Sequence, residues 1–443
     1  MSTSPSSTSP RDIGVGLIGF GNIGTGVVAA LNTNAEVMRS RLGGWGLKLV
    51  RIADQDITRR REAPYDPAIL TQSADELIAD PAVEIVIELV GGVEPARTFV
   101  EKALKAGKSV VTANKAMLAT HGASLWALAR THGVGLYFEA SVGGGIPIIR
   151  ALQTGLSANR INRVMGILNG TCNFILTAMA NDRRDFPSVL AEAQANGYAE
   201  PDPTYDIEGY DTAHKTAVLA SLAFGQDIRF QNVHVEGITR LSAVDFEYAA
   251  SLGYVIKLLG IASRDAEDGR VTVRVHPTLV PKSSLIASVD GVFNAVVVDG
   301  DLVGQTLFYG RGAGRNPTSS AILSDLMGLV ADISRGVAPG EHRLDVPEDK
   351  KNLASFTELE CRYMLRTHCE DRPGTMARLG TVLGNHKISI ESMIQKPVAD
   401  GTHAEIIIVT HRTSERHLQA AVKELDQEGL TKLPPVILRV EEV

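Results

Sequence analysis

Six residues near the start of the chain have the spacing of a phosphate-binding loop. They form the GxGxxG motif Gly19-Phe20-Gly21-Asn22-Ile23-Gly24. Gly19 permits a tight turn, Gly21 presents no side chain to a pyrophosphate, and Gly24 lets a helix pack closely on a strand. An ordinary glycine-rich turn has a similar composition. The apolar run before the motif and the helical spacing after it favour dinucleotide binding, with the free N–H groups of the helix start facing the phosphates.

The residues that follow the second expected strand bear on the choice between NAD and NADP. Asp54 could hold the hydroxyl groups of an adenosine ribose, which would suit NAD. Arg51 or the run Arg59–Arg61 could instead bind a 2′-phosphate, which would suit NADP. The sequence leaves both alternatives open.

Two lysines are candidate proton donors for the reduction of a carbonyl group. Lys115 follows Thr112 and Asn114 at the end of a short apolar strand, the edge of the sheet at which ligands bind in such folds. Lys215 lies four residues after Asp211, so the two side chains share one face of a helix. Taken alone, this second spacing favours an exposed ion pair of little energetic value.

These residues must be positioned by alternating strands and helices. Between residues 13 and 140, short and almost continuous apolar runs alternate with amphipathic stretches, which predicts a parallel sheet covered on both faces. We expect strands over 13–18, 47–53, 83–90, 109–112 and 135–139, and helices over 94–106 and 115–129.

From about residue 151 the pattern is typical of an α+β domain with several strands in a row. Residues 164–168 and 174–179 flank an expected turn at Asn169-Gly170. We expect helices over 188–196, 212–224 and 318–332, and strands over 271–277, 285–289, 295–299 and 305–308. The helix 318–332 is expected to pack back on the first domain.

The last stretch is interpreted as a compact and separate unit. Its expected order is strand 362–369, helix 374–385, strands 388–395 and 404–410, helix 414–424 and strand 436–441. This order is ferredoxin-like. The predicted fold class is α/β, a Rossmann-type doubly wound parallel sheet followed by an α+β domain and a ferredoxin-like domain. The predicted boundaries are 1–11 (disordered tail), 12–150 (dinucleotide-binding), 151–335 (α+β domain), 336–356 (linker) and 357–443 (ferredoxin-like domain). The resemblance described below implies substrate binding, catalysis and dimerisation for 151–335 and regulation for 357–443.

Composition narrows the possible partners. The formal net charge of −7 argues against nucleic acid. The three cysteines Cys172, Cys361 and Cys369 cannot form a disulfide framework, which fits a reducing cytoplasm. Because no apolar run reaches the ~20 residues that span a bilayer, we expect no membrane segment.

Several motifs occur in the order seen in homoserine dehydrogenases. They are Gly19–Gly24, Thr112–Lys115, Glu139–Pro147, Gly166–Asn173, Tyr198–Lys215 and Gly310–Pro317. The C-terminal stretch resembles an ACT domain, with Asp371-Arg372-Pro373-Gly374 at its first strand–helix turn. The resemblance implies NAD- or NADP-dependent interconversion of L-aspartate 4-semialdehyde and L-homoserine, in the biosynthesis of threonine, methionine and isoleucine.

The resemblance also implies roles for individual residues. Lys215 would be the proton donor and acceptor at the substrate oxygen, and Asp211 would orient it and contribute to substrate binding. Glu200 would bind the substrate ammonium group, and Lys115 would lie beside the nicotinamide and the reacting carbon. Further residues are implied at the cofactor, Thr112, Asn114 and Gly312, and near the substrate, Thr171.

The glycine-rich loop 139–147 is a candidate cation site. Three consecutive glycines leave backbone carbonyls unshielded, and hard cations prefer oxygen ligands. The resemblance implies a structural monovalent cation, Na⁺ or K⁺, bound by the carbonyls of Val142, Gly144 and Ile146 with Glu139 nearby. A glycine-rich domain junction is the alternative.

The resemblance implies threonine as an effector at the ACT domain, and a homodimer or homotetramer. A domain that only assembles subunits is the alternative to feedback regulation. Two rival functions also stay open. One is a Rossmann reductase of a different amino-acid semialdehyde, and the other is a non-enzymatic ACT sensor of amino acids. The candidate residues Lys115, Glu200, Asp211 and Lys215 argue against the sensor.

Overall fold

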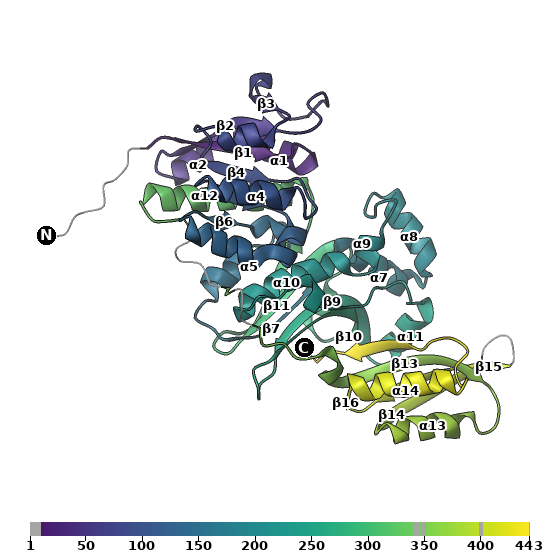
Figure 1. Cartoon of the computed structure of the whole chain (residues 1–443). Helices are drawn as coiled ribbons and strands as arrows, with labels where there is room; N and C mark the ends of the chain where they lie inside the picture. The colour runs from purple at the N-terminus through teal and green to yellow at the C-terminus, as the bar shows by residue number, and fades with distance from the viewer. Residues whose placement is uncertain (1–9, 340–345, 348–350, 398–401, 443) are drawn as a thin grey trace. The chain divides into compact units, whose positions relative to one another are not determined.

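The computed structural model describes residues 10–339, 346–347, 351–397 and 402–442 (Figure 1). The chain forms two compact units, each assembled from separate segments. Unit 1 contains residues 1–164, 214–232 and 294–351, and unit 2 contains residues 165–213, 233–293 and 352–443. Most of the tail expected over residues 1–11, and part of the linker expected over 336–356, lie outside the described residues.

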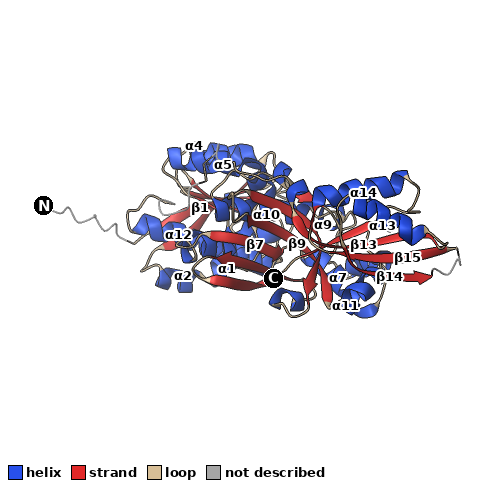
Figure 2. Cartoon of the chain, turned by 90° about the horizontal axis from the view of Figure 1, so that it is seen from below, coloured by secondary structure: helices blue, strands red, loops and turns tan. Residues whose placement is uncertain are grey.

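Unit 1 is built on a parallel six-stranded sheet with the order β3-β2-β1-β4-β5-β6. Its strands are β1 (Asp12–Ile18), β2 (Gly46–Ala53), β3 (Leu70–Thr71), β4 (Ile85–Glu88), β5 (Ser109–Thr112) and β6 (Leu136–Tyr137). The helices that follow them are α1 (Asn22–Thr33), α2 (Ala35–Arg41), α3 (Ala74–Ala79), α4 (Ala96–Lys105) and α5 (Lys115–Thr131). Figure 2 shows α4 and α5 on one face of the sheet and α1 and α2 on the other. The expected doubly wound sheet is therefore confirmed.

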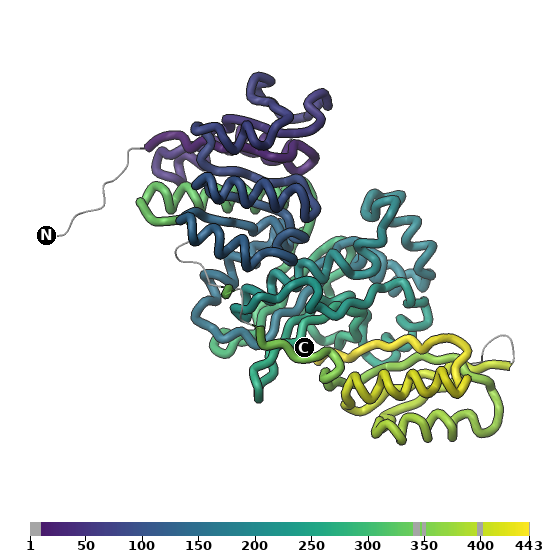
Figure 3. The backbone as a smooth tube through the Cα atoms, in the orientation of Figure 1, coloured from purple at the N-terminus to yellow at the C-terminus, as the bar shows by residue number. Residues whose placement is uncertain are grey.

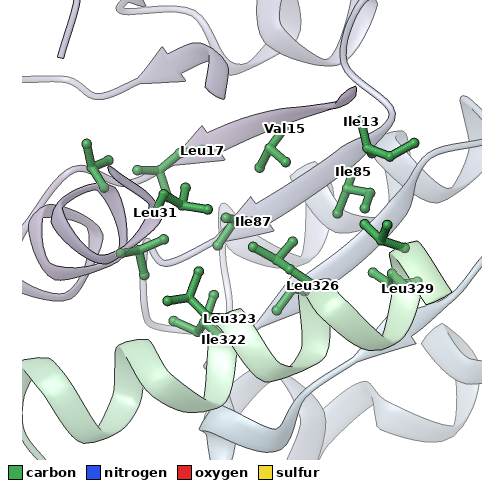
Figure 4. Close-up of a cluster of buried hydrophobic side chains, with 14 of the residues drawn as sticks. Ile13, Val15, Leu17, Leu31, Ile85, Ile87, Ile322, Leu323, Leu326 and Leu329 are labelled. Carbon is green, nitrogen blue, oxygen red and sulfur yellow. The ribbon is translucent and has the colours of Figure 1, made fainter. Parts of the chain in front are cut away.

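The long helix α12 (Arg315–Ser334) joins this sheet from far along the chain. Figure 3 shows its green segment among the purple and blue segments of the chain start. Its buried side chains Ile322, Leu326 and Leu329 face Val15 and Ile87 of the central strands (Figure 4). Each buried aliphatic side chain of this kind stabilises the fold by about 1.5–3 kcal/mol. The expectation that this helix packs on the first domain is confirmed.

Further elements complete unit 1 or cross its boundaries in the chain. They are α6 (Ile148–Arg150), β7 (Ile161–Ile167), α10 (Tyr210–Phe224), β11 (Phe293–Gly300) and β12 (Gly304–Arg311). The short 3-10 helix Phe230–Asn232, which follows α10, packs against α5 within unit 1.

Unit 2 contains helices and a sheet with the strand order β9-β10-β17-β13-β15-β14. Its helices are α7 (Gly170–Asp182), α8 (Phe186–Ala195), α9 (Thr204–Ile207), α11 (Ala243–Ser251), α13 (Thr375–Asn385) and α14 (Glu415–Gln427). Its strands are β8 (His234–Val235), β9 (Tyr254–Arg264), β10 (Val271–Pro281), β13 (Glu360–Glu370), β14 (Ile390–Pro397), β15 (His403–Thr410), β16 (Thr413–Ser414) and β17 (Val436–Val440). The ferredoxin-like order β13-α13-β14-β15-α14-β17 is confirmed.

The C-terminal domain is not separate from the rest of unit 2, contrary to the expectation. Its strand β17 pairs in parallel with β10, through Thr278 with Arg439 and Leu279 with Val440. Arg439 is buried and forms ion pairs at 2.7 Å with both Glu236, beside β8, and Glu415, at the start of α14. A shared sheet and a buried ion-pair cluster therefore join the domain to β10.

Three local expectations differ from the structure. Residues 285–289 form a 3-10 helix (Leu285–Ser288) rather than a strand, with Leu285 exposed and Ile286 buried. Strand β9 was not expected, although it pairs with β10 along its whole length. Asn169-Gly170 does not reverse the chain, because Asn169 is the N-cap of α7 and its side chain accepts a hydrogen bond from the N–H of Cys172.

Candidate functional site

The glycine loop lies between β1 and α1, and local geometry requires two of its three glycines, Gly19 and Gly24. Gly19 has φ of 98°, and a β-carbon there would lie 2.8 Å from the carbonyl of Leu89. A β-carbon on Gly24 would clash with the carbonyl oxygen of Gly19. Gly21 is the N-cap of α1, and a β-carbon there would meet nothing within 4 Å. The space beside Gly21 is thus open to a ligand that the N–H groups of α1 can bind.

A cavity of about 320 Å³ adjoins this loop at the carboxyl ends of β1, β2 and β4. Gly19, Gly21, Asp54 and Val90 are among its lining residues. This is the edge at which doubly wound sheets bind dinucleotides. The loop and the cavity together fit a dinucleotide.

Asp54, at the end of β2, is bound to the glycine loop and to an arginine. Its carboxylate accepts a hydrogen bond from the N–H of Phe20 at 2.5 Å and lies 3.1 Å from the guanidinium of Arg61. The Arg61 side chain is only 2% exposed, and it lies over the Phe20 ring. Arg51, the other arginine considered for a 2′-phosphate, pairs instead with Asp80 at 3.0 Å. Asp54 therefore carries a neutralised rather than an isolated negative charge.

A buried network links the ends of β4 and β5, and its centre, Glu88, was not expected from the sequence. The Glu88 carboxylate accepts hydrogen bonds from the Thr112 hydroxyl at 2.6 Å and from the N–H of Val90 at 2.7 Å. The Thr112 oxygen in turn accepts from the N–H of Asn114, whose side chain donates to the carbonyl of Gly92. The network fixes the residues immediately before Lys115, the first residue of α5.

Burial raises the pKa of the Glu88 carboxyl group above its usual range, although the hydrogen bond from Thr112 opposes this. A carboxyl group with a raised pKa stabilises the fold while protonated, and that contribution is lost as pH rises through the folded-state pKa. We therefore expect the Tm of Glu88→Gln, relative to the parent, to increase as the pH rises above the usual range of a glutamate carboxyl group. Thermal unfolding at a series of pH values measures this difference.

Glu84→Gln is the matched control with the opposite sign. The hydrogen bond and charge of Arg11 lower the pKa of Glu84, so the stability it contributes is present above its unfolded pKa and is lost on acidification. The Tm of Glu84→Gln, relative to the parent, should accordingly fall as pH rises through the acidic range. A Glu88→Gln difference that does not change with pH would contradict the assignment of Glu88.

The Gly310–Gly314 loop lies beside the cofactor loop within unit 1. Arg315, the first residue of α12, donates a hydrogen bond to the side chain of Asn22 at 2.7 Å. On its other side the loop contacts the glycine-rich segment 142–146. The N–H of Gly145 donates to the carbonyl of Arg311 at 3.0 Å. The backbones of Gly144 and Gly312 lie so close that a β-carbon on Gly144 would clash with Gly312. The structure thus brings Asn22 and Gly312 to one region.

Two buried carboxylates meet at the loop 139–147, that of Glu139 in the loop itself and that of Asp325 on α12, which accepts a hydrogen bond from the N–H of Glu139 at 2.8 Å. Both oxygens of Glu139 accept backbone hydrogen bonds, from Ile149 and Arg150, at 2.9 Å. Burial, followed by the neighbouring charge of Asp325, raises the pKa of Glu139 to about 7. The carbonyl of Ile146 accepts from the N–H of Ile148, and Gly143 and Gly144 have positive φ. Within the described residues no group of three or more His, Cys, Asp or Glu side chains could hold a metal ion, so carbonyl oxygens would dominate any site here.

In unit 2 the side chain of Asn169 joins two carboxylates. Its amide nitrogen donates to Asp206 at 2.7 Å and to Asp211 at 2.9 Å. Burial and the charges of Asp211 and Asp206 raise the pKa of Tyr205. Asp206 was not expected from the sequence. Its position three residues after Pro203, in the segment that follows Glu200, was the only sequence feature that pointed to it.

Two other expected substrate residues lie on the same segments of unit 2. The Thr171 hydroxyl donates to the carbonyl of Tyr198 at 2.6 Å, which ties α7 to the loop that contains Glu200. Glu200 and Tyr198 are exposed. The Cys172 thiol is buried and donates to the carbonyl of Asp206, in keeping with a structural role.

The pair Asp211 and Lys215 is not an exposed ion pair. Both residues lie on α10, and they are only 5% and 8% exposed. Lys215 belongs to unit 1 together with Lys115, whereas Thr171, Glu200 and Asp211 belong to unit 2. The convergence of the two lysines on one reacting atom stays a prediction.

The expected effector turn lies at the end of β13 and borders a cavity of about 360 Å³. Gly374 has φ of 94° and is the N-cap of α13, and Gln395 of β14 donates to Asp371 at 2.9 Å. The turn thus presents the first N–H groups of α13 at a polar cavity.

Comparisons with known proteins match all three parts of the chain. Residues 19–139 match the family model "Homoserine dehydrogenase, NAD binding domain", residues 147–327 match "Homoserine dehydrogenase", and residues 363–429 match "ACT domain". The homoserine dehydrogenase of Pseudomonas aeruginosa is 44% identical over 442 residues, covering 98% of this chain and 100% of that one.

Solved structures agree with these matches. The crystal structure of a homoserine dehydrogenase from Thiobacillus denitrificans superposes with a TM-score of 0.89 at 41% identity, covering 98% of this chain and 100% of that one. A hyperthermophilic archaeal homoserine dehydrogenase in complex with NADPH shares the fold at a TM-score of 0.60 and 24% identity, over 72% of this chain and 97% of that one.

Proposed function

Because the chain belongs to the homoserine dehydrogenase family, we propose that its residues perform NAD(P)-dependent interconversion of L-homoserine and L-aspartate 4-semialdehyde as follows. Lys215 donates a proton to the substrate oxygen during reduction and removes it during oxidation. The observation that carries this assignment is the burial of Lys215 one helical turn after Asp211, which itself is held by Asn169. A buried lysine with an acidic partner can exchange a proton with a substrate without competition from water.

The substrate's charged ends need partners of opposite charge. We assign its ammonium group to the acidic residues Glu200 and Asp211, with Asp206 as an addition from the structure, since Asn169 binds Asp206 and Asp211 together. Thr171 is assigned to the same region because it is hydrogen-bonded to the loop before Glu200. Lys115 is assigned to the reacting carbon.

The cofactor is assigned to the glycine loop and the cavity beside it. When bound, the nicotinamide supplies or accepts a hydride. The cofactor would be held by Gly19–Gly24, Thr112, Asn114 and Gly312. The first three of these lie at the carboxyl edge of the sheet, and Gly312 lies in the loop that Arg315 joins to Asn22. The archaeal relative in complex with NADPH supports NADP as a cofactor.

We expect Arg61→Ala to discriminate between the two cofactors. Arg61 neutralises Asp54, so its removal would place an uncompensated carboxylate beside the adenosine ribose and repel a 2′-phosphate. The KM for NADP should rise at least about tenfold more than the KM for NAD, an effect of about 1.4 kcal/mol. Steady-state kinetics with each cofactor measure the ratio.

Arg51→Ala is the matched control for this variant. Arg51 forms an ion pair of similar length with Asp80, which does not border the cofactor cavity. Its removal should leave the ratio of the two KM values unchanged. Equal effects of the two substitutions on that ratio would refute the role given to Arg61.

A monovalent cation, Na⁺ or K⁺, is proposed at the loop 139–147. The ligands would be the carbonyls of Val142, Gly144 and Ile146, with the carboxylate of Glu139 nearby. The buried carboxylates of Glu139 and Asp325 lie together there and would be stabilised by a positive charge. Its role is assigned as structural.

Removal of this cation should lower the stability of the protein. We expect replacement of NaCl and KCl by choline chloride at constant ionic strength to lower the Tm by about 2–5 °C, since ligands that bind only the folded state stabilise it. Glu139→Gln should abolish this difference while the parent retains it. Identical melting curves in all three salts would remove the cation from the proposal.

The ACT domain suggests regulation by a small molecule, and we propose threonine as the effector at the turn Asp371–Gly374. The N–H groups at the start of α13 can bind its carboxylate, and the adjoining cavity is polar. A homodimer or homotetramer and a cytoplasmic location are proposed with it. Within the described part of the chain no helix is both long and apolar enough to cross a membrane.

One assay tests the proposed function directly. Purified protein is incubated with homoserine and with either NAD or NADP, with and without threonine, and formation of the reduced cofactor is followed by absorbance. We expect turnover with homoserine and inhibition by threonine. Activity only with another hydroxy amino acid would favour a different semialdehyde reductase, and no turnover with any of them would favour an amino-acid sensor.

A further inference from the structure

Unit 2 contains a cavity of about 250 Å³ that shares no lining residue with the cofactor cavity or the effector turn. It lies where the segment 235–241 approaches the strand β17. Its polar lining includes Glu208, Tyr210, Thr239 and Arg240, and its apolar lining includes Leu241 and Leu438. None of these groups has a role in the reaction described above.

The cavity exists because two short strands share one edge of β10. Strand β8 pairs with β10 at Arg274 and Val275, and β17 pairs with it only at Thr278 and Leu279. Pro277 lies between the two pairings and has no N–H to donate. The beginning of β17, residues 436–438, pairs with β13 on one side and borders the cavity on the other. A strand edge with backbone donors and acceptors therefore forms one wall.

Opposite charges lie on this small cavity. The Glu208 carboxylate accepts a hydrogen bond from the Thr239 hydroxyl at 3.1 Å, which leaves its second oxygen for another donor. Arg240 is exposed, and its guanidinium donates to the carbonyl of Pro435 at 3.1 Å, with further N–H groups available. A second carboxylate on the lining, Glu236, is already ion-paired with Arg439 at 2.7 Å. The Glu208 carboxylate, the Arg240 guanidinium and the apolar patch match the ammonium, the carboxylate and the side chain of an α-amino acid.

We propose that this cavity binds a free α-amino acid, whose ammonium group contacts Glu208 and whose carboxylate contacts Arg240. This site is distinct from the effector turn at Asp371–Gly374, which borders a different cavity at the end of β13. The chain would thus hold two amino-acid sites.

The cavity wall is continuous with the start of α10, which gives the site a route to the reaction. The N–H of Ile238 donates to the carbonyl of Ile207 at 2.8 Å, and a β-carbon on Gly237 would lie 2.6 Å from the Cα of Glu208. Gly209, with φ of 84°, turns the chain directly from this contact into α10. Binding of a ligand in the cavity would therefore hold residues 207–209 in place. These residues directly precede the first turn of α10, which contains Asp211.

Thermal unfolding of the full-length protein with each of the twenty protein L-amino acids tests the proposal. We expect at least one of them to raise the Tm, and Arg240→Ala to weaken its binding by about tenfold or more. Arg412→Ala is the matched control, because Arg412 is also exposed and donates to a backbone carbonyl, that of Glu360, at 3.1 Å. This control should keep the full rise in Tm.

Arg372→Ala separates the new site from the effector turn. An amino acid bound in the new cavity stabilises Arg372→Ala as it does the parent. The proposal is overturned if no amino acid raises the Tm of the parent, or if Arg240→Ala keeps the full rise in Tm. It is also overturned if Arg372→Ala is the only variant in which the rise in Tm is lost.

Hydrogen exchange tests the coupling between the cavity and the start of α10. The amides of residues 210–213 should exchange more slowly when the amino acid is bound, and unchanged exchange would refute the coupling.

Discussion

Replacement of Lys215 by alanine is expected to lower kcat for homoserine oxidation by about 10²–10⁴-fold, the range over which general acid–base groups act. The loss should appear in both directions, because the same amine gives and removes the proton. The Kd for the reduced cofactor, measured by its fluorescence, should stay within about twofold, since Lys215 is not assigned to cofactor binding.

Two further variants separate proton transfer from charge and from folding. Lys215→Arg keeps a positive charge, but a guanidinium does not release its proton in proteins, so this variant should also be inactive. Lys108→Ala removes a lysine with the same exposure of 8%, whose ammonium group donates to backbone carbonyls of Asp80 and Val83. It should lower the Tm and keep the kcat of the folded protein. Near-normal turnover of Lys215→Ala would refute the assigned role.

The second large effect is expected for Gly21→Ala. A β-carbon at this position meets no protein atom within 4 Å, so the fold has room for it. The same space is where a pyrophosphate must approach the N–H groups of α1. Loss of one charge-assisted hydrogen bond costs about 1.5–3 kcal/mol, so the KM for both cofactors should rise by about 10–10²-fold.

Gly155→Ala is the control for this substitution. A β-carbon on Gly155 also meets nothing within 4 Å, and Gly155 lies outside the cofactor cavity. Both variants should unfold at the temperature of the parent, and only Gly21→Ala should change the KM of the cofactor. An unchanged KM in Gly21→Ala would mean that the pyrophosphate binds elsewhere.

The sequence predicted those parts of the fold that have a local pattern. The strands before Gly19 and Lys115 and the helices after them follow from apolar runs, glycines and caps that lie next to each other in the chain. The β10–β17 pairing could not be predicted in this way. Residues Thr278 and Arg439 are far apart in the chain, and strand pairing of that kind leaves no local periodicity.

In the candidate site, too, features set by neighbouring residues were predictable and features set by distant residues were not. The GxGxxG loop and the Asp211–Lys215 spacing are local, whereas the side chain of Asn169, which binds Asp206 and Asp211, acts across three segments. Asn169 was interpreted as a turn residue because asparagine favours turns and helix N-caps alike. Glu88 did leave a signal, since a carboxylate inside an apolar strand must have buried partners.

Strand β17 also determines when the protein can finish folding during its synthesis. The free edge of β10 is covered at Thr278 and Leu279 only after residues 439 and 440 have left the ribosome. Until then a nascent chain carries an open strand edge, which invites pairing with other chains. A version shortened before this strand would keep that edge permanently, and would leave Arg274 without its partner Glu441. We therefore expect a chain shortened before β17 to aggregate more readily than the full-length protein, which light scattering during refolding would measure.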